Sequence, residues 1–159
     1  MAKRFVVLVV LAIVAAAAVP ASADGNKLSL GYAYLKSLED GGGSIPMGAF
    51  VNFAPGDDSG FELDLGFHRD SDADLNSFTG ALGPRFSLGD GSPFLHVMGG
   101  ARYNSTPGHS DFDFGGMAGA GYDLGTGGSV ALRLGADFQM FFRSGGNDKS
   151  LRLVVGLTF

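Results

Sequence analysis

Apolar and polar residues alternate along most of the chain after residue 26. The cleanest segment is 61–68, where Phe61, Leu63, Leu65 and Phe67 alternate with Glu62, Asp64, Gly66 and His68. Successive side chains of a β-strand point to opposite faces, so such a segment sets an apolar face against a polar one. The same pattern, bounded by turn residues, predicts eight strands at 27–36, 44–54, 61–68, 76–88, 95–103, 112–124, 130–142 and 150–159.

The segments that connect these predicted strands differ in length. Those after the second, fourth and sixth strands are short and rich in Gly, Asp, Ser and Pro, whereas 37–43, 70–75, 104–111 and 144–149 are longer. Short turns at one end and longer loops at the other are typical of outer-membrane barrels. We therefore expect the four longer segments to form loops on the outer side. Pro46 is expected at the end of its strand, where a missing backbone donor matters least.

Residues 1–23 have the layout of a secretory signal peptide. Lys3 and Arg4 precede an apolar run over 5–19, and Ala21-Ser22-Ala23 supplies small residues for cleavage. A run of this length is shorter than the ~18–20 residues needed to span a bilayer as a helix. We expect a cleaved signal peptide at 1–23 and one mature domain at 24–159.

No later apolar run is long enough for a membrane helix. A chain that sits in a bilayer with strands must close them into a barrel, because only closure satisfies every backbone hydrogen-bonding group. The predicted fold is all-β: a closed eight-stranded antiparallel up-and-down transmembrane barrel. Leu, Phe, Val and Tyr would face lipid, and small and charged residues would fill the interior.

The main alternative is a soluble periplasmic barrel of the lipocalin type, which has the same period but turns its apolar face inward. The polar face argues against it, because its small residues fit a narrow lumen and its charges nearly balance. Buried charges persist when they are paired. The expected interior charge network consists of Glu62, Asp64, Arg85, His96, Arg102, Asp113, Asp123, Arg133, Asp137 and Arg152.

Aromatic residues on the apolar face also sort by depth. Those near one end of the predicted strands are Phe53, Phe61, Phe86, Tyr122 and Phe159, and those near the other end are Tyr34, Phe67, Phe78, Tyr103, Phe112 and Phe142. Two aromatic girdles around an apolar band are what the two interfaces of a bilayer select. This arrangement favours the membrane barrel.

Composition and charge exclude several other classes. The net charge is −5, and removal of Lys3 and Arg4 would leave 9 basic against 16 acidic residues. No basic stripe is present, so a nucleic-acid partner is not expected. The chain has no cysteine, which excludes disulfides, thiol chemistry and a lipid-anchored cysteine. No cofactor is expected either.

The signal-like start, the eight alternating segments and the stretches 78–86, 93–100 and 131–159 resemble small outer-membrane β-barrels. The similarity is to the OmpA-domain and OmpX type and to the outer membrane protein beta-barrel domain group. It implies outer-membrane lipid and lipopolysaccharide as surroundings in a Gram-negative cell. It also implies that the barrel assembly machinery reads the last strand, in which Leu153, Val155, Leu157 and Phe159 would form the assembly signal.

Three short segments suggest chemistry, but none satisfies its motif. Asp70-Ser-Asp72-Ala-Asp74 begins like a calcium loop, yet Leu75 and Ala81 replace the required Gly and Glu. His109-Ser110 is similar to the Ser/His pair of outer-membrane lipid A deacylases, but adjacent residues of an extended chain point apart. The glycine-rich run 115–121 lacks the Lys-Ser/Thr of a phosphate-binding loop.

No catalytic, cofactor-binding or metal-binding residue is therefore expected. The predicted function is an integral outer-membrane barrel with a structural or surface-interaction role and an unspecified surface partner. A lipid A deacylase-like enzyme and the lipocalin-like binding barrel remain the alternatives.

Overall fold

The computed structural model describes residues 26–39, 41–56, 59–89, 93–125 and 129–159, all as strands, turns and connections without a helix. The expected signal peptide at 1–23 lies outside these residues. No helix in the described residues is long and apolar enough to cross a membrane. The strands are β1 (Lys27–Ser37), β2 (Ser44–Ile45), β3 (Met47–Ala54), β4 (Ser59–Asp70), β5 (Leu75–Ser87), β6 (Pro93–Thr106), β7 (His109–Gly125), β8 (Ala131–Arg143) and β9 (Gly146–Thr158).

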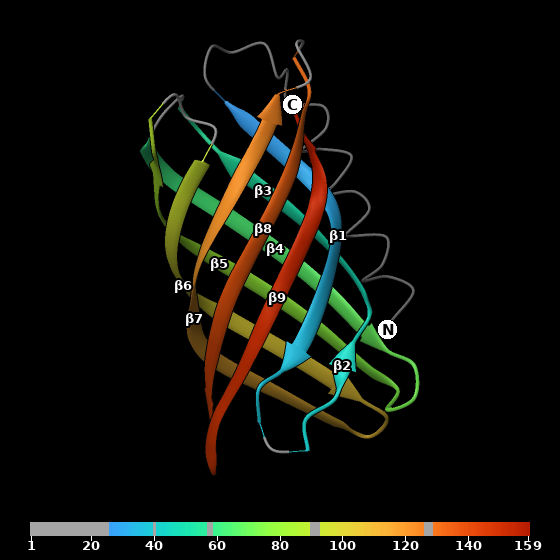
Figure 1. The fold of residues 1–159 in the computed structure, drawn as a ribbon. Coiled ribbons are helices and arrows are strands. Elements are labelled where there is room, and N and C mark those ends of the chain that lie inside the picture. The colour runs from blue at the N-terminus through green and yellow to red at the C-terminus, as the bar shows by residue number, and fades with distance from the viewer. Residues whose placement is uncertain (1–25, 40, 57–58, 90–92, 126–128) are drawn as a thin grey trace.

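The strands form one antiparallel sheet that closes on itself. Neighbours in sequence pair in order, and β1 also pairs with β9, so the blue and red strands lie side by side in Figure 1. β2 and β3 are two parts of one barrel strand. The predicted closed, eight-stranded, up-and-down antiparallel barrel is confirmed.

Pro46 separates β2 from β3 inside the second barrel strand. Tyr32 pairs with Ala49, but Leu35 pairs with Ile45, so the ladder skips one residue between these two pairs. Proline cannot donate to the ladder, and an extra residue at that point makes a bulge. The barrel strand reaches Ser44 as predicted, but Pro46 lies at a bulge inside it and not at its end.

The paired residues are staggered around the barrel. From Leu28, the pairing runs through Phe53, Leu63, Leu82, Gly99, Gly116, Met140 and Lys149, which is hydrogen-bonded to Leu38. One circuit from residue 28 to residue 38 is a stagger of ten residues. Strands in a closed barrel with such a stagger are tilted to its axis, as Figure 1 shows.

The barrel has two ends, called the mouth end and the terminal end. The mouth end carries the connections at 38–43, 71–74, 107–108 and 144–145, and the terminal end carries Lys27, Phe159 and the connections at 55–58, 88–92 and 126–130. The expected contrast in loop length is wrong, because the β6–β7 and β8–β9 connections at the mouth end are tight turns.

These two turns are short because backbone pairing continues through polar residues. Asn104 pairs with Asp111, and Thr106 pairs with His109, inside the segment expected to be a loop. Gly108 and Gly145, with φ of 81° and 107°, supply the left-handed backbone that a tight turn needs. Polar side chains do not end a strand whose backbone groups still find partners.

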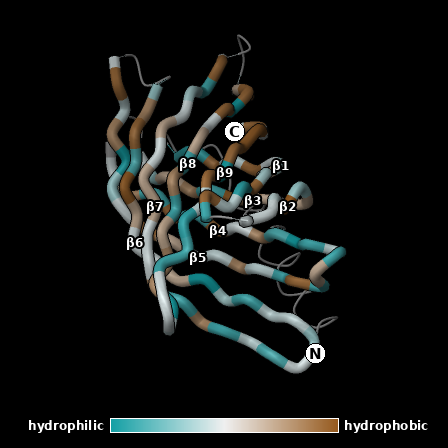
Figure 2. Tube along the Cα trace, turned by 60° about the horizontal axis from the view of Figure 1, so that its bottom comes forward, coloured by the Kyte–Doolittle hydropathy of each residue, from teal (hydrophilic) through white to brown (hydrophobic). Residues whose placement is uncertain are grey.

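The strand faces divide as predicted, with the apolar side outward. Leu63, Leu65, Val97 and Leu153 are exposed, whereas Glu62 and Asp64 have no exposed surface. Figure 2 shows hydrophobic and hydrophilic positions alternating along the strands. A lipocalin-like barrel would have an apolar interior, so the outward facing of the apolar side chains contradicts that alternative.

The interior also holds large apolar side chains, whereas mainly small and charged residues were expected to fill it. They are Phe50, Phe94, Met98, Met117 and Phe141, each at most 3% exposed. They fill the lumen between the charged side chains, because a barrel of eight strands has an interior that side chains can fill. The lumen is therefore a packed core of mixed polarity.

Candidate functional site

The layer of the lumen nearest the terminal end is built around Asp123. Arg133 donates to its two oxygens from Nε and Nη2, at 2.7 and 2.8 Å, and Arg85 donates from Nη2 at 3.1 Å. The Arg85 guanidinium lies 3.8 Å from the centre of the Phe94 ring, and that of Arg133 lies 4.7 Å from it. The apolar ring thus serves as a platform for two cations that share one carboxylate.

Glu62 lies beside this layer and is completely buried. Its oxygens are 3.6 Å from Arg85 Nη1, 3.7 Å from His96 Nδ1 and 3.8 Å from Arg133 Nη1. These separations are ion-pair contacts but are too long for hydrogen bonds. Glu62 is therefore flanked by two guanidinium groups and one imidazole.

The middle layer is built around Arg152 on β9. This side chain donates from Nη1 and Nη2 to the two oxygens of Asp64, at 2.8 and 2.9 Å, and from Nε to Asp137 at 2.7 Å. The oxygens Asp137 Oδ1 and Asp64 Oδ2 also contact His96 Nε2, at 2.7 Å, and Asn52 Nδ2, at 2.5 Å, respectively. Two-point pairing of a planar guanidinium with a carboxylate is both strong and directional.

The upper layer, closest to the mouth, is built around Arg102. Its Nη2 donates to Asp113 at 3.2 Å and to Asp148 at 2.5 Å, and Arg143 donates to the same Asp148 oxygen at 3.1 Å. The Arg102 guanidinium lies 4.5 Å from the centre of the Phe141 ring. The three layers together hold all ten residues of the expected charge network, each at most 7% exposed.

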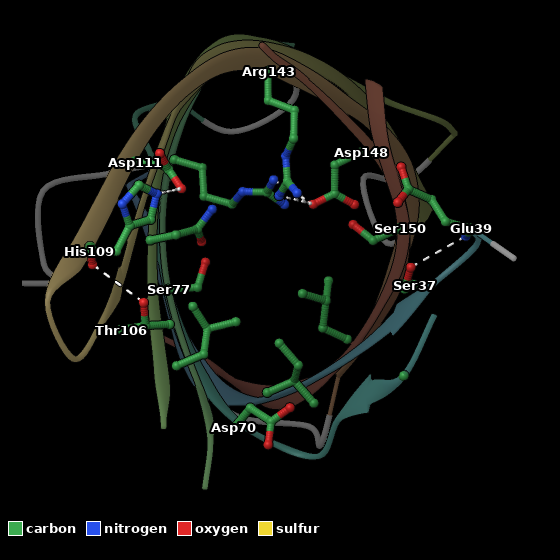
Figure 3. Close-up of a pocket in the computed structure, with 16 residues that line it drawn as sticks. Ser37, Glu39, Asp70, Ser77, Thr106, His109, Asp111, Arg143, Asp148 and Ser150 are labelled. Atoms are coloured by element: carbon green, nitrogen blue, oxygen red, sulfur yellow. Dashed lines mark hydrogen bonds and ion pairs between the residues drawn. The ribbon is translucent and has the colours of Figure 1, made fainter. Parts of the chain in front are cut away.

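Above Arg102 the barrel opens into a cavity of about 380 Å³. Figure 3 shows its labelled side chains arranged around an open centre, with Arg143 and Asp148 joined across β8 and β9. The lining includes four carboxylates (Glu39, Asp70, Asp111 and Asp148) together with Arg102, Arg143 and His109. The cavity is large enough for a small polar ligand.

His109 and Asp111 both line this cavity, and their Nε2 and Oδ2 atoms are 3.0 Å apart. Ser110 lies between them in β7, so its side chain points to the opposite face of the strand. The structure thus provides the carboxylate partner that the sequence analysis did not identify for His109. It directs the adjacent hydroxyl away from the same histidine.

The aspartates of the segment 70–74 bind backbone groups. Asp70 Oδ1 accepts hydrogen bonds from the backbone N–H groups of Asp72 and Ala73, at 3.0 and 3.2 Å, and this closes the turn. Within the described part of the chain, no group of three or more His, Asp and Glu is arranged to hold a metal ion.

The eleven residues of the expected aromatic girdles are all on the outer surface. Seven are exposed (Phe61, Phe86, Tyr103, Phe112, Tyr122, Phe142 and Phe159) and four are half-buried (Tyr34, Phe53, Phe67 and Phe78). The structure adds Phe114, which is 66% exposed and has its ring 5.1 Å from that of Phe112. The expected assembly residues Leu153, Val155, Leu157 and Phe159 also face outward. Whether these positions act as girdles and as a signal stays a prediction.

The expected interior charge network left out two contributors, Asn52 and Asp148. Asn52 joins two layers, because it donates to Asp64 and accepts from Arg133 Nη1 at 3.3 Å. Asp148 was placed in a loop, yet it pairs with Phe141 in the ladder and binds Arg102. Side-chain alternation along its strand places Asn52 on the polar face. Extending the same alternation past Lys149 would have placed Asp148 there as well.

Gly119 leaves the space in which His96 and Asp137 meet. A Cβ added to Gly119 would lie 2.1 Å from Asp137 Oδ1, 2.7 Å from His96 Nε2 and 2.7 Å from the backbone oxygen of Ala136. We expect Gly119→Ala to lower the free energy of unfolding by about 1–3 kcal/mol, as overpacking does. Urea unfolding of the folded barrel in detergent micelles measures this change.

Gly99→Ala is the matched control, since a Cβ there would have no atom within 4 Å. We expect that variant to unfold within about 1 kcal/mol of the unmodified protein. Equal stability of the two alanine variants would contradict the tight packing at Gly119.

No protein-family model matches the chain, and no curated protein matches it. Three solved structures are similar in fold. Neisserial surface protein A (NspA) has 15% identity, covers 85% of this chain and 96% of its own, and has a TM-score of 0.64. The attachment invasion locus protein Ail of Yersinia pestis has 18% identity, coverages of 85% and 99%, and a TM-score of 0.56. The N-terminal β-barrel domain of Pseudomonas aeruginosa OprF has 14% identity, coverages of 85% and 98%, and a TM-score of 0.55.

These three proteins are small eight-stranded outer-membrane barrels, so the expected resemblance to that type is confirmed at the level of the fold.

Proposed function

We propose that this chain is an integral outer-membrane β-barrel with a structural or surface-interaction role and without catalytic activity. The observation that carries the proposal is the facing of the side chains. Large apolar residues such as Phe61, Val97 and Leu82, each more than half exposed, cover the outside, whereas arginines and carboxylates fill the inside. An apolar outer surface is unfavourable in water, whereas a bilayer solvates it and leaves the charged side chains inside the closed barrel.

The height of the outer apolar surface supports the same proposal. On strands that carry residues of both expected girdles, these lie between six residues apart (Phe61 and Phe67) and ten residues apart (Phe112 and Tyr122). At ~3.4 Å per residue and a tilt of about 40°, this is roughly 15–26 Å along the barrel axis. An outer-membrane barrel has an apolar band of about 25 Å between its aromatic girdles.

The mouth supports a surface-interaction role over a catalytic one. Its charged cavity is open, whereas the lumen below Arg102 is occupied by ion pairs and aromatic rings. The orientation of Ser110 argues against the lipid A deacylase alternative, because a serine nucleophile has to reach its histidine.

Assembly through the last strand is part of the proposal. Leu153, Val155 and Leu157 on β9 form one outward apolar row with Phe159, which directly follows that strand, and β9 closes the barrel against β1. The barrel assembly machinery would read this row after export through the signal peptide expected at 1–23. Closure is completed by reciprocal backbone hydrogen bonds between Leu28 and Phe159, at 3.1 and 2.8 Å.

The test is the electrophoretic mobility of the protein extracted from outer membranes, compared before and after boiling. A closed barrel resists detergent until heated, so the two samples should run at different apparent sizes. A protein found in the soluble periplasmic fraction, with one mobility in both samples, would refute the proposal.

A further inference from the structure

Three basic side chains stand on the outer surface at the mouth end. They are the exposed Lys36, Arg69 and Lys149, whereas the cavity is lined by four carboxylates together with Arg102, Arg143 and His109. Each of these cations is adjacent in sequence to a cavity-lining residue: Ser37, Asp70 and Asp148. Because neighbours in a strand point to opposite faces, the three cations face away from the lumen.

These three cations stand out from the rest of the outer surface. The other outward strand positions that the structure describes carry apolar or uncharged side chains, such as Leu65, Asn76 and Tyr103. No carboxylate shares this face with the cations along the described strands. Along the described strands, the charged side chains on the outward face at the mouth end are therefore these three cations.

The three cations also lie at one height on the barrel. A stagger of ten residues over eight strands shifts the height by about 1.25 residues per strand. Lys36 pairs with Leu151, Lys149 is hydrogen-bonded to Leu38, and Arg69 pairs with Met47. Corrected for the stagger, Lys36, Arg69 and Lys149 fall within about one residue of each other.

The cations therefore form a compact patch, called here the cationic patch. It spans the adjacent barrel strands β9, β1, β2/β3 and β4, a width of roughly 19 Å at ~4.8 Å between strands and a tilt of about 40°. Lys36 and Arg69 are each one outward position beyond an aromatic residue, Tyr34 and Phe67. The patch thus lies at the mouth-side edge of the apolar band, where lipid headgroups meet a membrane barrel.

We propose that the cationic patch binds the phosphate groups of anionic lipids in the leaflet at the mouth end. The proposal rests on the membrane location proposed above. Long basic side chains beside an apolar band reach the headgroup level, and their charge complements lipid phosphates. Lys36 Nζ donates to the backbone oxygen of Gly42 at 3.3 Å, and an ammonium has two further hydrogens to offer.

The experiment titrates phosphatidylglycerol into the folded barrel in zwitterionic detergent micelles and measures bound lipid by native mass spectrometry. The variant Lys36→Gln, Arg69→Gln, Lys149→Gln should bind about a hundredfold more weakly, because each of the three headgroup-level cations contributes roughly a fivefold change in affinity. The variant Lys36→Arg, Arg69→Lys, Lys149→Arg keeps the three charges and should stay within about threefold of the unmodified protein.

Arg143→Gln controls for charge alone, since Arg143 lies in the mouth beside Asp148. It should change the affinity less than about twofold, and a loss equal to that of the triple glutamine variant would refute the proposal. Inorganic phosphate at the same concentration should not displace the lipid if the site is for a headgroup. Displacement by it would show a free-phosphate site and overturn the assignment to lipid.

Each variant is also compared boiled and unboiled. Unchanged lipid affinity in a triple glutamine variant that keeps its heat-dependent mobility would overturn the patch and leave the membrane barrel standing. Loss of heat-dependent mobility in the unmodified protein would instead refute the proposed function itself.

Discussion

Replacing Arg152 by alanine is expected to lower the free energy of unfolding by about 3–5 kcal/mol, because it breaks a buried ion pair from one side. Arg152 is 1% exposed and makes three hydrogen bonds to Asp64 and Asp137. Its removal leaves these two carboxylates in the lumen without their main cation. His96 would remain as a partner of Asp137, and Asn52 as a partner of Asp64.

Urea unfolding in detergent micelles, followed by the fraction that keeps the folded mobility, measures this loss. Arg143→Ala is the matched control, because Arg143 is also paired with an aspartate but has a side chain that is 49% exposed. An exposed pair contributes less than about 1 kcal/mol. Adding Asp64→Asn to Arg152→Ala should recover part of the stability, since it removes one stranded charge.

An Arg152→Ala protein that unfolds at the same urea concentration as the unmodified barrel would contradict the buried network. It would mean that water in the lumen solvates the two carboxylates.

Replacing Val97 by arginine is expected to cost about 2–4 kcal/mol in phospholipid vesicles, the effect of a cation near the middle of the bilayer. Val97 is 56% exposed on β6 and faces outward, roughly midway between the two sets of outward aromatics. In a barrel surrounded by water, the same substitution would be nearly neutral, because Val97 has no buried partners to lose. The variant therefore distinguishes an outer surface that contacts lipid from one that contacts water.

Ser105→Arg on the same strand and face is the control. Ser105 lies toward the mouth beyond Tyr103, outside the apolar band, so its substitution should cost about 0–1 kcal/mol. Equal and small effects at Val97 and Ser105 would contradict a membrane location of the band.

Alternation predicted the facing of the strands correctly because it depends on local geometry alone. Glu62 and Leu63 lie on opposite sides of the barrel wall whatever the rest of the chain does, once the segment is extended. Closure also followed, because strands in a bilayer have no other way to satisfy their edges. The ten charges of the interior network were found for this reason.

The partners of those charges could not be predicted in the same way. Arg152 donates to Asp64, 88 residues away, and Arg133 donates to Asn52, 81 residues away. Which side chains meet across the lumen depends on the stagger of the barrel, and the stagger is set by all eight strand pairings together. A single alternating segment carries no information on that sum.

Strand ends were another limit of the sequence analysis. The segment 104–111 looks like a loop because its side chains are polar, yet its backbone remains paired as far as Thr106 and His109. Side-chain polarity reports the solvent near a residue, whereas a strand ends where its backbone partner ends. Side-chain type also did not predict the facing of Phe94 and Phe141. These large apolar residues point into the lumen, where their rings contact the guanidinium groups of Arg85 and Arg102.

The sequence alone thus determined that the chain forms extended strands with one apolar and one polar face, because alternation is a property of each strand by itself. Only the tertiary structure decided the height at which each residue lies. Because their heights match, Arg152 contacts Asp64 and Asp137 inside the barrel, and Lys36 lies level with Arg69 and Lys149 on the outside. It is decided by closure with a ten-residue stagger, which joins strands that are distant in the chain.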